Sequence, residues 1–284
     1  MLALPPLAAE PIFYISSFPV TNTVINSTLT MLGFVVFAFL INRGVKRFGI
    51  SKAPKGILNF FESVLELLYG YFDTVTHDRK KTIQFLPLVG TLFLFILVSN
   101  WIGLLPGIGS IGRYLVHEGH VELIPVFRPA NTDLNLTIAM AATVVIVSHV
   151  LGIAVIGFFK YANKFIKLGD LYHALKSMNP INIMTAVIEF FVGLLEVISE
   201  VAKLLSLSLR LFGNVFAGEV LLTVLAGILP VVLPLPFMAL ELIVGVVQAT
   251  VFSMLTLVYL TIATTPVISH DKAHPEDLEP TPSV

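Results

Sequence analysis

An apolar run of about fifty residues, from Ile181 to Leu229, contains no proline and constrains the fold more than any other stretch. As a single α-helix it would extend about 73 Å, more than twice the ~30 Å hydrocarbon core of a bilayer. It therefore either breaks into two spans or forms one strongly tilted helix that begins outside the hydrocarbon. Because Gly193 would make only a weak turn, we predict the tilted helix.

The polar residues of this run recur at steps of three and four, which a helix places in one stripe. We call these residues the polar stripe: Glu196, Ser199, Lys203, Ser206, Arg210 and Asn214. An arginine at the centre of a membrane helix costs roughly 2.5–3.5 kcal/mol on insertion scales, so such a residue usually serves a charge-handling task. Two structural alternatives are hydrogen bonding between helices and snorkelling of the arginine to the headgroups.

The chemistry of Arg210 narrows its role. Snorkelling suits helix ends, whereas Arg210 has over fifteen mainly apolar residues on each side. Its guanidinium stays protonated, so it cannot relay protons, but it can attract an ionised carboxylate and repel a passing proton. Glu196 lies nearly four turns away on the same helix face. We therefore expect the partner carboxylate to come from another chain.

The composition requires a membrane. Of 284 residues, 56% are hydrophobic and 12% charged, with a mean hydropathy of +0.91, whereas soluble domains carry about 25% charged residues. There is no cysteine, which excludes disulfides and thiolate metal sites. Because no Lys or Arg precedes Arg43, we expect neither a signal peptide nor a transit peptide.

The apolar segments predict a single all-α polytopic membrane domain with about five spanning helices. The segment 54–77 has one polar stripe and predicts an amphipathic helix in the membrane interface, with a buried helix packed on its neighbours as the alternative. The predicted ranges are an external segment 1–23, spans 24–42, 83–105 and 134–159, a long tilted hairpin 181–229 and 237–263, and a disordered tail 266–284.

Basic residues fix the predicted orientation. Twelve of the seventeen Lys and Arg residues fall in three segments that follow the first span, precede the second and follow the third. By the positive-inside rule these segments are cytoplasmic, so the N-terminus is outside and the C-terminus cytoplasmic. The opposite loop, 106–132, carries Arg113, His117, His120 and Arg128. No acid or cysteine completes a metal ligand set with the two histidines, so we interpret them as solvated loop residues.

The segment Ser206-Leu-Ser-Leu-Arg210-Leu-Phe-Gly213-Asn214, followed by Ala217-Gly-Glu219, closely resembles the signature of subunit a of F-type ATP synthases. The resemblance continues to the C-terminal helix and, more loosely, back to Met1. It implies a stationary subunit with two offset half-channels and a long oblique hairpin wrapped against a rotor. It also implies c-ring subunits, each with a carboxylate, as partners, together with the subunit b peripheral stalk and the rest of the synthase, but no nucleic acid.

The resemblance also implies roles for residues. It assigns proton translocation to Arg210, Asn214, Glu219, Glu241 and Gln248. It assigns the cytoplasmic half-channel to Glu196, Ser199, Lys203 and Ser206, and the mouth of the external half-channel to Asp133 and Asn135. Asp133 could equally cap a helix. His149, an intramembrane ionisable group, is placed with the external half-channel; a structural hydrogen bond and an interfacial position are the alternatives.

One position departs from the family pattern. Opposite Glu219 the last helix often bears a histidine, whereas this chain has Glu241. Two buried carboxylates close together cannot both ionise cheaply, so we hypothesise that they share a proton and still act as a relay.

Two other classes compete with this interpretation. A secondary transporter would show paired halves with broken helices, and no such repeat occurs. A purely structural subunit fits poorly with Arg210, Glu219 and Glu241 in apolar surroundings. No GxxxxGK[ST] loop occurs, so ATP chemistry belongs to partner chains, and we predict no cofactor and no metal. A bacterial plasma (inner) membrane is the expected location, with an organelle-encoded chain as the alternative.

Overall fold

A computed structural model describes Pro6 and residues 8–48, 56–105, 111–117, 120–165 and 180–265. Five helices in this part of the chain are long and apolar enough to cross a membrane. They are α1 (Asn22–Phe48), α3 (Arg79–Ile102), α4 (Leu134–Ile156), α7 (Pro180–Ile228) and α8 (Pro234–Ala263). The predicted all-α polytopic class is confirmed. The predicted tail lies outside the described residues.

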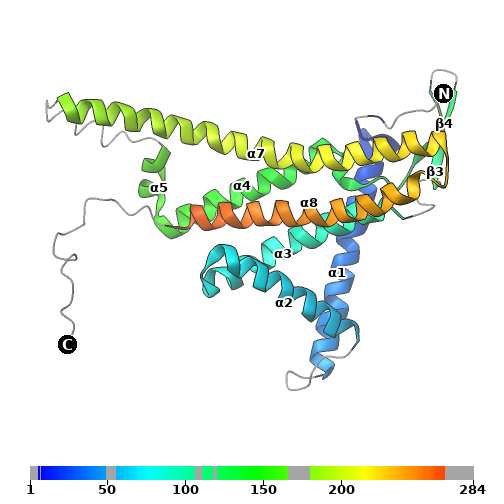
Figure 1. Ribbon diagram of the computed structural model, residues 1–284, viewed down its shortest axis with the longest axis horizontal. Coiled ribbons are helices and arrows are strands. Elements are labelled where there is room, and N and C mark those ends of the chain that lie inside the picture. The colour runs from blue at the N-terminus through cyan, green and yellow to red at the C-terminus, as the bar shows by residue number, and fades with distance from the viewer. Residues whose placement is uncertain are drawn as a thin grey trace.

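The long C-terminal run is one continuous helix of 49 residues, α7, rather than two spans. A turn at residues 229–233 reverses the chain, and α8 begins at Pro234, where a missing N–H removes no helix hydrogen bond. The two helices lie side by side and antiparallel along the long axis of the molecule (Figure 1). They form the predicted long hairpin.

The core lies where α8 packs on α3, α4 and α2. Its buried side chains include Phe85, Val89 and Ile96 of α3, with Phe252 and Leu257 of α8. The amphipathic helix α2 (Ile57–Thr76) contributes Leu68 and Phe72 to the same cluster. Its Glu62 and Glu66 are exposed, whereas Asp73 is partly buried and accepts the Thr82 hydroxyl at 2.9 Å. Helix α2 thus packs one apolar face on its neighbours and leaves most of its polar stripe exposed. Helix α1 crosses the others steeply (Figure 1).

Two β-hairpins, which the sequence analysis did not anticipate, lie at one end of the bundle. They are β1 (Pro11–Ile15) with β2 (Phe18–Thr21), and β3 (Gly112–His117) with β4 (His120–Pro125). We call this the hairpin end (Figure 1). A short 3-10 helix, η2 (Ala130–Thr132), follows and contacts α1, α3, α4 and α7.

The predicted third span, 134–159, ends earlier than expected. Helix α4 stops at Ile156 because Gly157 takes φ 92° and ψ 146°, a conformation that residues with a side chain rarely adopt. The chain then turns into the short helix α5 (Phe158–Phe165), which contacts both α4 and α7. We call this the α5 end of the bundle; it lies opposite the hairpin end (Figure 1).

Candidate functional site

The polar stripe lies on a face of α7 that the rest of the chain leaves uncovered. Ser199, Ser206, Arg210 and Asn214 are exposed, and Glu196 and Lys203 are partly exposed. The buried side chains Leu207 and Leu211 lie on the adjoining face of the helix and pack on the core. Within the described residues, the one hydrogen bond of the Arg210 side chain joins its Nη2 to Ser206 Oγ at 3.4 Å. The guanidinium therefore has no carboxylate partner in the described part of its own chain.

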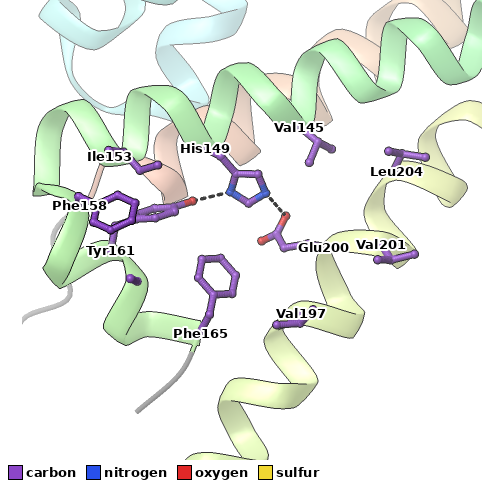
Figure 2. A pocket seen from close by; sticks show the side chains of 11 residues that line it. Val145, His149, Ile153, Phe158, Tyr161, Phe165, Val197, Glu200, Val201 and Leu204 are labelled. Atoms are coloured by element: carbon purple, nitrogen blue, oxygen red, sulfur yellow. Dashed lines mark hydrogen bonds and ion pairs between the residues drawn. The ribbon is translucent and has the colours of Figure 1, made fainter. Parts of the chain in front are cut away.

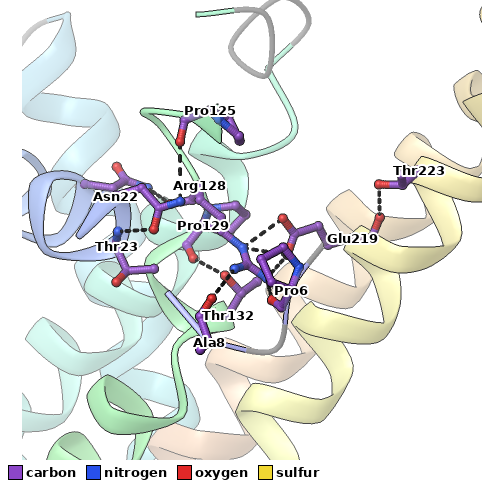
Figure 3. A network of polar contacts seen from close by, with 11 residues as sticks. Pro6, Ala8, Asn22, Thr23, Pro125, Arg128, Pro129, Thr132, Glu219 and Thr223 are labelled. Atoms are coloured by element: carbon purple, nitrogen blue, oxygen red, sulfur yellow. Dashed lines mark hydrogen bonds and ion pairs between the residues drawn. The ribbon is translucent and has the colours of Figure 1, made fainter. Parts of the chain in front are cut away.

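At the hairpin end, Glu219 of α7 is paired with Arg128, whose side chain is only 2% exposed to solvent. Arg128 Nε donates to both carboxylate oxygens of Glu219 at 2.9 and 3.0 Å, and Nη2 donates to Oε2 at 2.9 Å. The same guanidinium donates to the carbonyls of Pro6 at 2.9 Å and Ala8 at 3.4 Å (Figure 3). The pair thus joins three distant segments of the chain.

The sequence did not predict that Arg128 is buried and paired with Glu219. We expected Arg128 in an external loop, but it is among the largest fully buried side chains. The available signal was its place immediately before Pro129, in the segment that leads into the predicted helix at 134. A buried arginine needs a carboxylate, and Glu219 supplies it.

The carboxyl group of Glu241 crosses from α8 to α7 and lies against Gly218. A Cβ atom at that glycine would collide with the carboxyl group, so the missing side chain makes room for it. No hydrogen bond joins Glu241 to Glu219 in the described residues, whereas Glu219 binds Arg128. In the described residues Glu219 is therefore paired with Arg128 and not with Glu241. The proton shared by Glu219 and Glu241 stays a hypothesis. Gln248, seven residues further along α8, is buried.

Asp133 lies at the hairpin end as well, at the start of α4. Its Oδ1 accepts the backbone N–H of Asn135 at 2.9 Å, so it caps the helix, and its Oδ2 accepts the hydroxyl of Thr23 at 2.9 Å. Asn135 itself is exposed. The buried amide of Asn26 reaches the Arg128 carbonyl at 2.7 Å. Asp133 thus caps α4 through one carboxylate oxygen and binds a neighbouring hydroxyl through the other.

The structure does not bring His149 together with Asp133 and Asn135, which corrects the expected grouping. His149 lies sixteen positions after Asp133, about 24 Å along α4. At the α5 end its Nδ1 lies 2.7 Å from the hydroxyl of Tyr161, and its Nε2 lies 3.8 Å from Oε2 of Glu200 (Figure 2). Glu200 Oε1 accepts from Lys203 Nζ at 2.7 Å. His149 therefore belongs to the same end of α7 as Glu196 and Lys203.

Neither Tyr161 nor Glu200 was singled out from the sequence. Glu200 lies four residues after Glu196 and three before Lys203, so helical spacing could have indicated it. Tyr161 follows a turn that no periodicity reveals. Burial raises the pKa of the Tyr161 hydroxyl above its ordinary value of 10.0, and the Glu200 and Glu196 carboxylates raise it further. Tyr161 is therefore a neutral hydrogen-bonding group at physiological pH.

In the described residues, no group of three or more His, Asp or Glu side chains is arranged to hold a metal ion. Ionisable side chains instead collect at two separate ends of α7, with a lone arginine between them on an exposed face. Fold and site together define a class: a polytopic helical membrane protein with ionisable side chains on its long apolar helices.

The chain belongs to the ATP synthase A chain family, because the model of that family matches residues 24–261. ATP synthase subunit a of Moorella thermoacetica is 31% identical over 249 residues, which cover 88% of this chain and 93% of that protein. ATP synthase subunit a of Gloeobacter violaceus is 32% identical over 253 residues, 89% of this chain and 86% of that protein. The subunit a of Geotalea uraniireducens is 34% identical over 213 residues, 75% and 76% of the two chains.

Proposed function

We propose that this chain is the stationary, proton-translocating subunit of the Fo motor of an ATP synthase, with two offset half-channels and Arg210 as the charge barrier between them. The observation that carries this proposal is the exposed guanidinium of Arg210 on α7, whose one hydrogen bond in the described chain is to Ser206. An arginine in apolar surroundings without its own carboxylate calls for one from a neighbour. A c-ring carboxylate supplies it.

The proposed path uses the two ends of α7. A proton enters at the hairpin end near Asp133 and Asn135 and passes the region of Glu219, Glu241 and Gln248 to a ring carboxylate. The neutralised carboxyl group then travels through lipid. It loses its proton beside Arg210 and Asn214, and the proton leaves towards the α5 end along a half-channel lined by Glu196, Ser199, Lys203 and Ser206.

Arg210 separates the two half-channels by its charge. It stays protonated and so favours an ionised ring carboxylate. The same charge repels a proton that would otherwise leak directly from one half-channel to the other. The driving energy is about 2.3 kcal/mol per charge per 100 mV of membrane potential.

The assembly and location follow from this role. The chain works with the c-ring, the subunit b peripheral stalk and the remaining ATP synthase subunits, and ATP chemistry takes place on those other subunits. We place it in a bacterial plasma (inner) membrane with the hairpin end external and the C-terminus cytoplasmic. The bacterial relatives support this location, and the distribution of basic residues supports this orientation.

ATP-driven proton pumping in inverted vesicles tests the proposal. Arg210→Ala should abolish pumping while the complex still assembles on a native gel. The matched control is Arg113→Ala, because Arg113 is an exposed arginine that donates to a backbone carbonyl, that of Ile12. It should pump normally. Undiminished pumping by the Arg210 variant would reduce the polar stripe to a contact between helices and would refute the proposal.

A further inference from the structure

A cavity of about 470 Å³ lies between α4, α5 and α7 at the α5 end of the bundle. Most of its wall is apolar, formed by side chains such as Val145 and Val197. Its polar groups are His149, Tyr161 and Glu200, one from each of the three helices (Figure 2). The proton path described above does not use this set of groups.

The three polar groups form a continuous chain. Lys203 Nζ binds one carboxylate oxygen of Glu200 at 2.7 Å, which leaves the other oxygen facing His149 Nε2 at 3.8 Å. On the far side of the imidazole, Nδ1 lies 2.7 Å from the Tyr161 hydroxyl. Each ring nitrogen therefore faces a different proton-exchanging group.

Two glycines place Tyr161 in this position. The positive φ of Gly157 turns α5 back towards α4. A Cβ atom at Gly152 would collide with the Tyr161 ring, so α4 leaves a slot in which the ring lies. The Tyr161 residue is 6% exposed. The contact with His149 is thus built into the local fold and does not depend on a mobile surface side chain.

We propose that Glu200, His149 and Tyr161 form a proton-transfer chain that carries the departing proton from the polar stripe of α7 to the aqueous side at the α5 end. This inference rests on the proposed function. The protonated Glu200 carboxyl group gives its proton to His149 Nε2, and the proton on Nδ1 passes to the Tyr161 oxygen. Tyr161 releases its own hydroxyl proton to water. One proton enters and one leaves, and the imidazole ends as its other neutral tautomer.

The surrounding charges suit this sequence. The groups that face the imidazole or its immediate partners are Tyr161 on α5, Glu196, Glu200 and Lys203 on α7, and the ring of Tyr259 on α8, which lies 5.4 Å from Lys203 Nζ. The raised pKa of Tyr161 keeps it from accumulating as tyrosinate, so it acts by exchanging one proton for another. The 3.8 Å step must shorten or include one water, as is common before transfer.

Passive proton conductance of vesicles stripped of the soluble sector measures this chain directly. His149→Ala and Tyr161→Phe should each lower conductance by about tenfold or more, the scale of lost acid–base participation. Added imidazole should restore conductance to His149→Ala, because the cavity can admit the missing ring.

Matched controls are Thr143→Val on the exposed face of α4 and Tyr71→Phe on α2, both expected to conduct normally. Unchanged conductance of the Tyr161 or His149 variants would overturn the inference, as would a loss in His149→Ala that imidazole does not rescue. If His149→Ala does not assemble, Tyr161→Phe decides alone, since it keeps the ring packing. Arg210→Ala, assayed alongside for ATP-driven pumping, separates the two ideas: loss of pumping in that variant, with normal conductance of the His149 and Tyr161 variants, removes only the inference.

Discussion

The ion pair between Arg128 and Glu219 should be the strongest single tether at the hairpin end. Arg128→Met keeps the apolar volume of the stem but removes every donor to Glu219, Pro6 and Ala8. Removing one partner of a buried pair costs about 3–5 kcal/mol. Because 19% of the Glu219 side chain is exposed, its carboxylate keeps some hydration, and we expect the lower end, about 3 kcal/mol. That loss shifts the unfolding equilibrium by roughly a hundredfold.

The reverse variant, Glu219→Leu, should cost more, towards about 5 kcal/mol, because it leaves the 2%-exposed Arg128 without a counter-charge. The double variant Arg128→Met/Glu219→Leu should cost far less than the sum of the two, since replacing a buried pair by apolar side chains is often neutral. The difference is the coupling energy between the two side chains.

Denaturation in mixed micelles, followed by tryptophan fluorescence, supplies the measurement. The chain has one tryptophan, Trp101, whose Nε1 donates to the Leu242 carbonyl of α8 at 3.1 Å, so its emission reports the separation of α3 from α8. Arg113→Met is the control and should cost about 1 kcal/mol or less, because one part-buried hydrogen bond to a backbone carbonyl is lost. Additive effects of the two single variants, or a cost of Arg128→Met no larger than the control, would refute the reasoning.

Two further predictions concern the α5 end. Gly157→Ala should lower stability by about 1–3 kcal/mol, because φ 92° with ψ 146° strains any residue that has a side chain. Gly33→Ala, in the open interior of α1, should instead raise stability by up to about 1 kcal/mol. Thermal unfolding of both variants checks this, and equal effects would contradict it. The pKa of Tyr161 is higher in the folded chain than its ordinary value of 10.0, so its contribution to stability is complete below pH 10.0 and is lost as the pH rises through the folded pKa. The stability of Tyr161→Phe should therefore fall less in alkali than that of the native chain. Tyrosinate absorbance should show one fewer late-titrating hydroxyl in that variant, and identical alkaline curves would contradict the prediction.

Periodicity was enough to predict the five long helices, the amphipathic helix and the alignment of the polar residues of α7 in one stripe. The unbroken run without proline forms α7. Its polar residues align in one stripe because a period of 3.6 residues is a local property of the helix. Helix ends were less predictable. Gly157 looks like any membrane glycine in the sequence, and its positive φ is set by where α5 must pack.

The polar pairings required tertiary structure. Arg128 reaches Glu219 across 91 positions of sequence, and His149 reaches Glu200 across a helix–helix contact, so no spacing rule applies to either. His149 was grouped with Asp133 because both belong to one predicted span, although a span has two ends about 24 Å apart. The short hairpins were missed because their residues lie in Gly- and Pro-bearing segments that resemble ordinary loops.

The short helix α5 also has a mechanical consequence. Helix α7 is supported near its hairpin end by α4, α8 and η2, and α5 contacts it nearer the other end, beyond which the helix overhangs (Figure 1). A rod held at two points divides a sideways force between its two supports. A force on the stretch around Arg210 is therefore shared between the bundle and α5. The stiffness of the eight-residue helix α5 then limits how far the charged face of α7 is displaced by such a force.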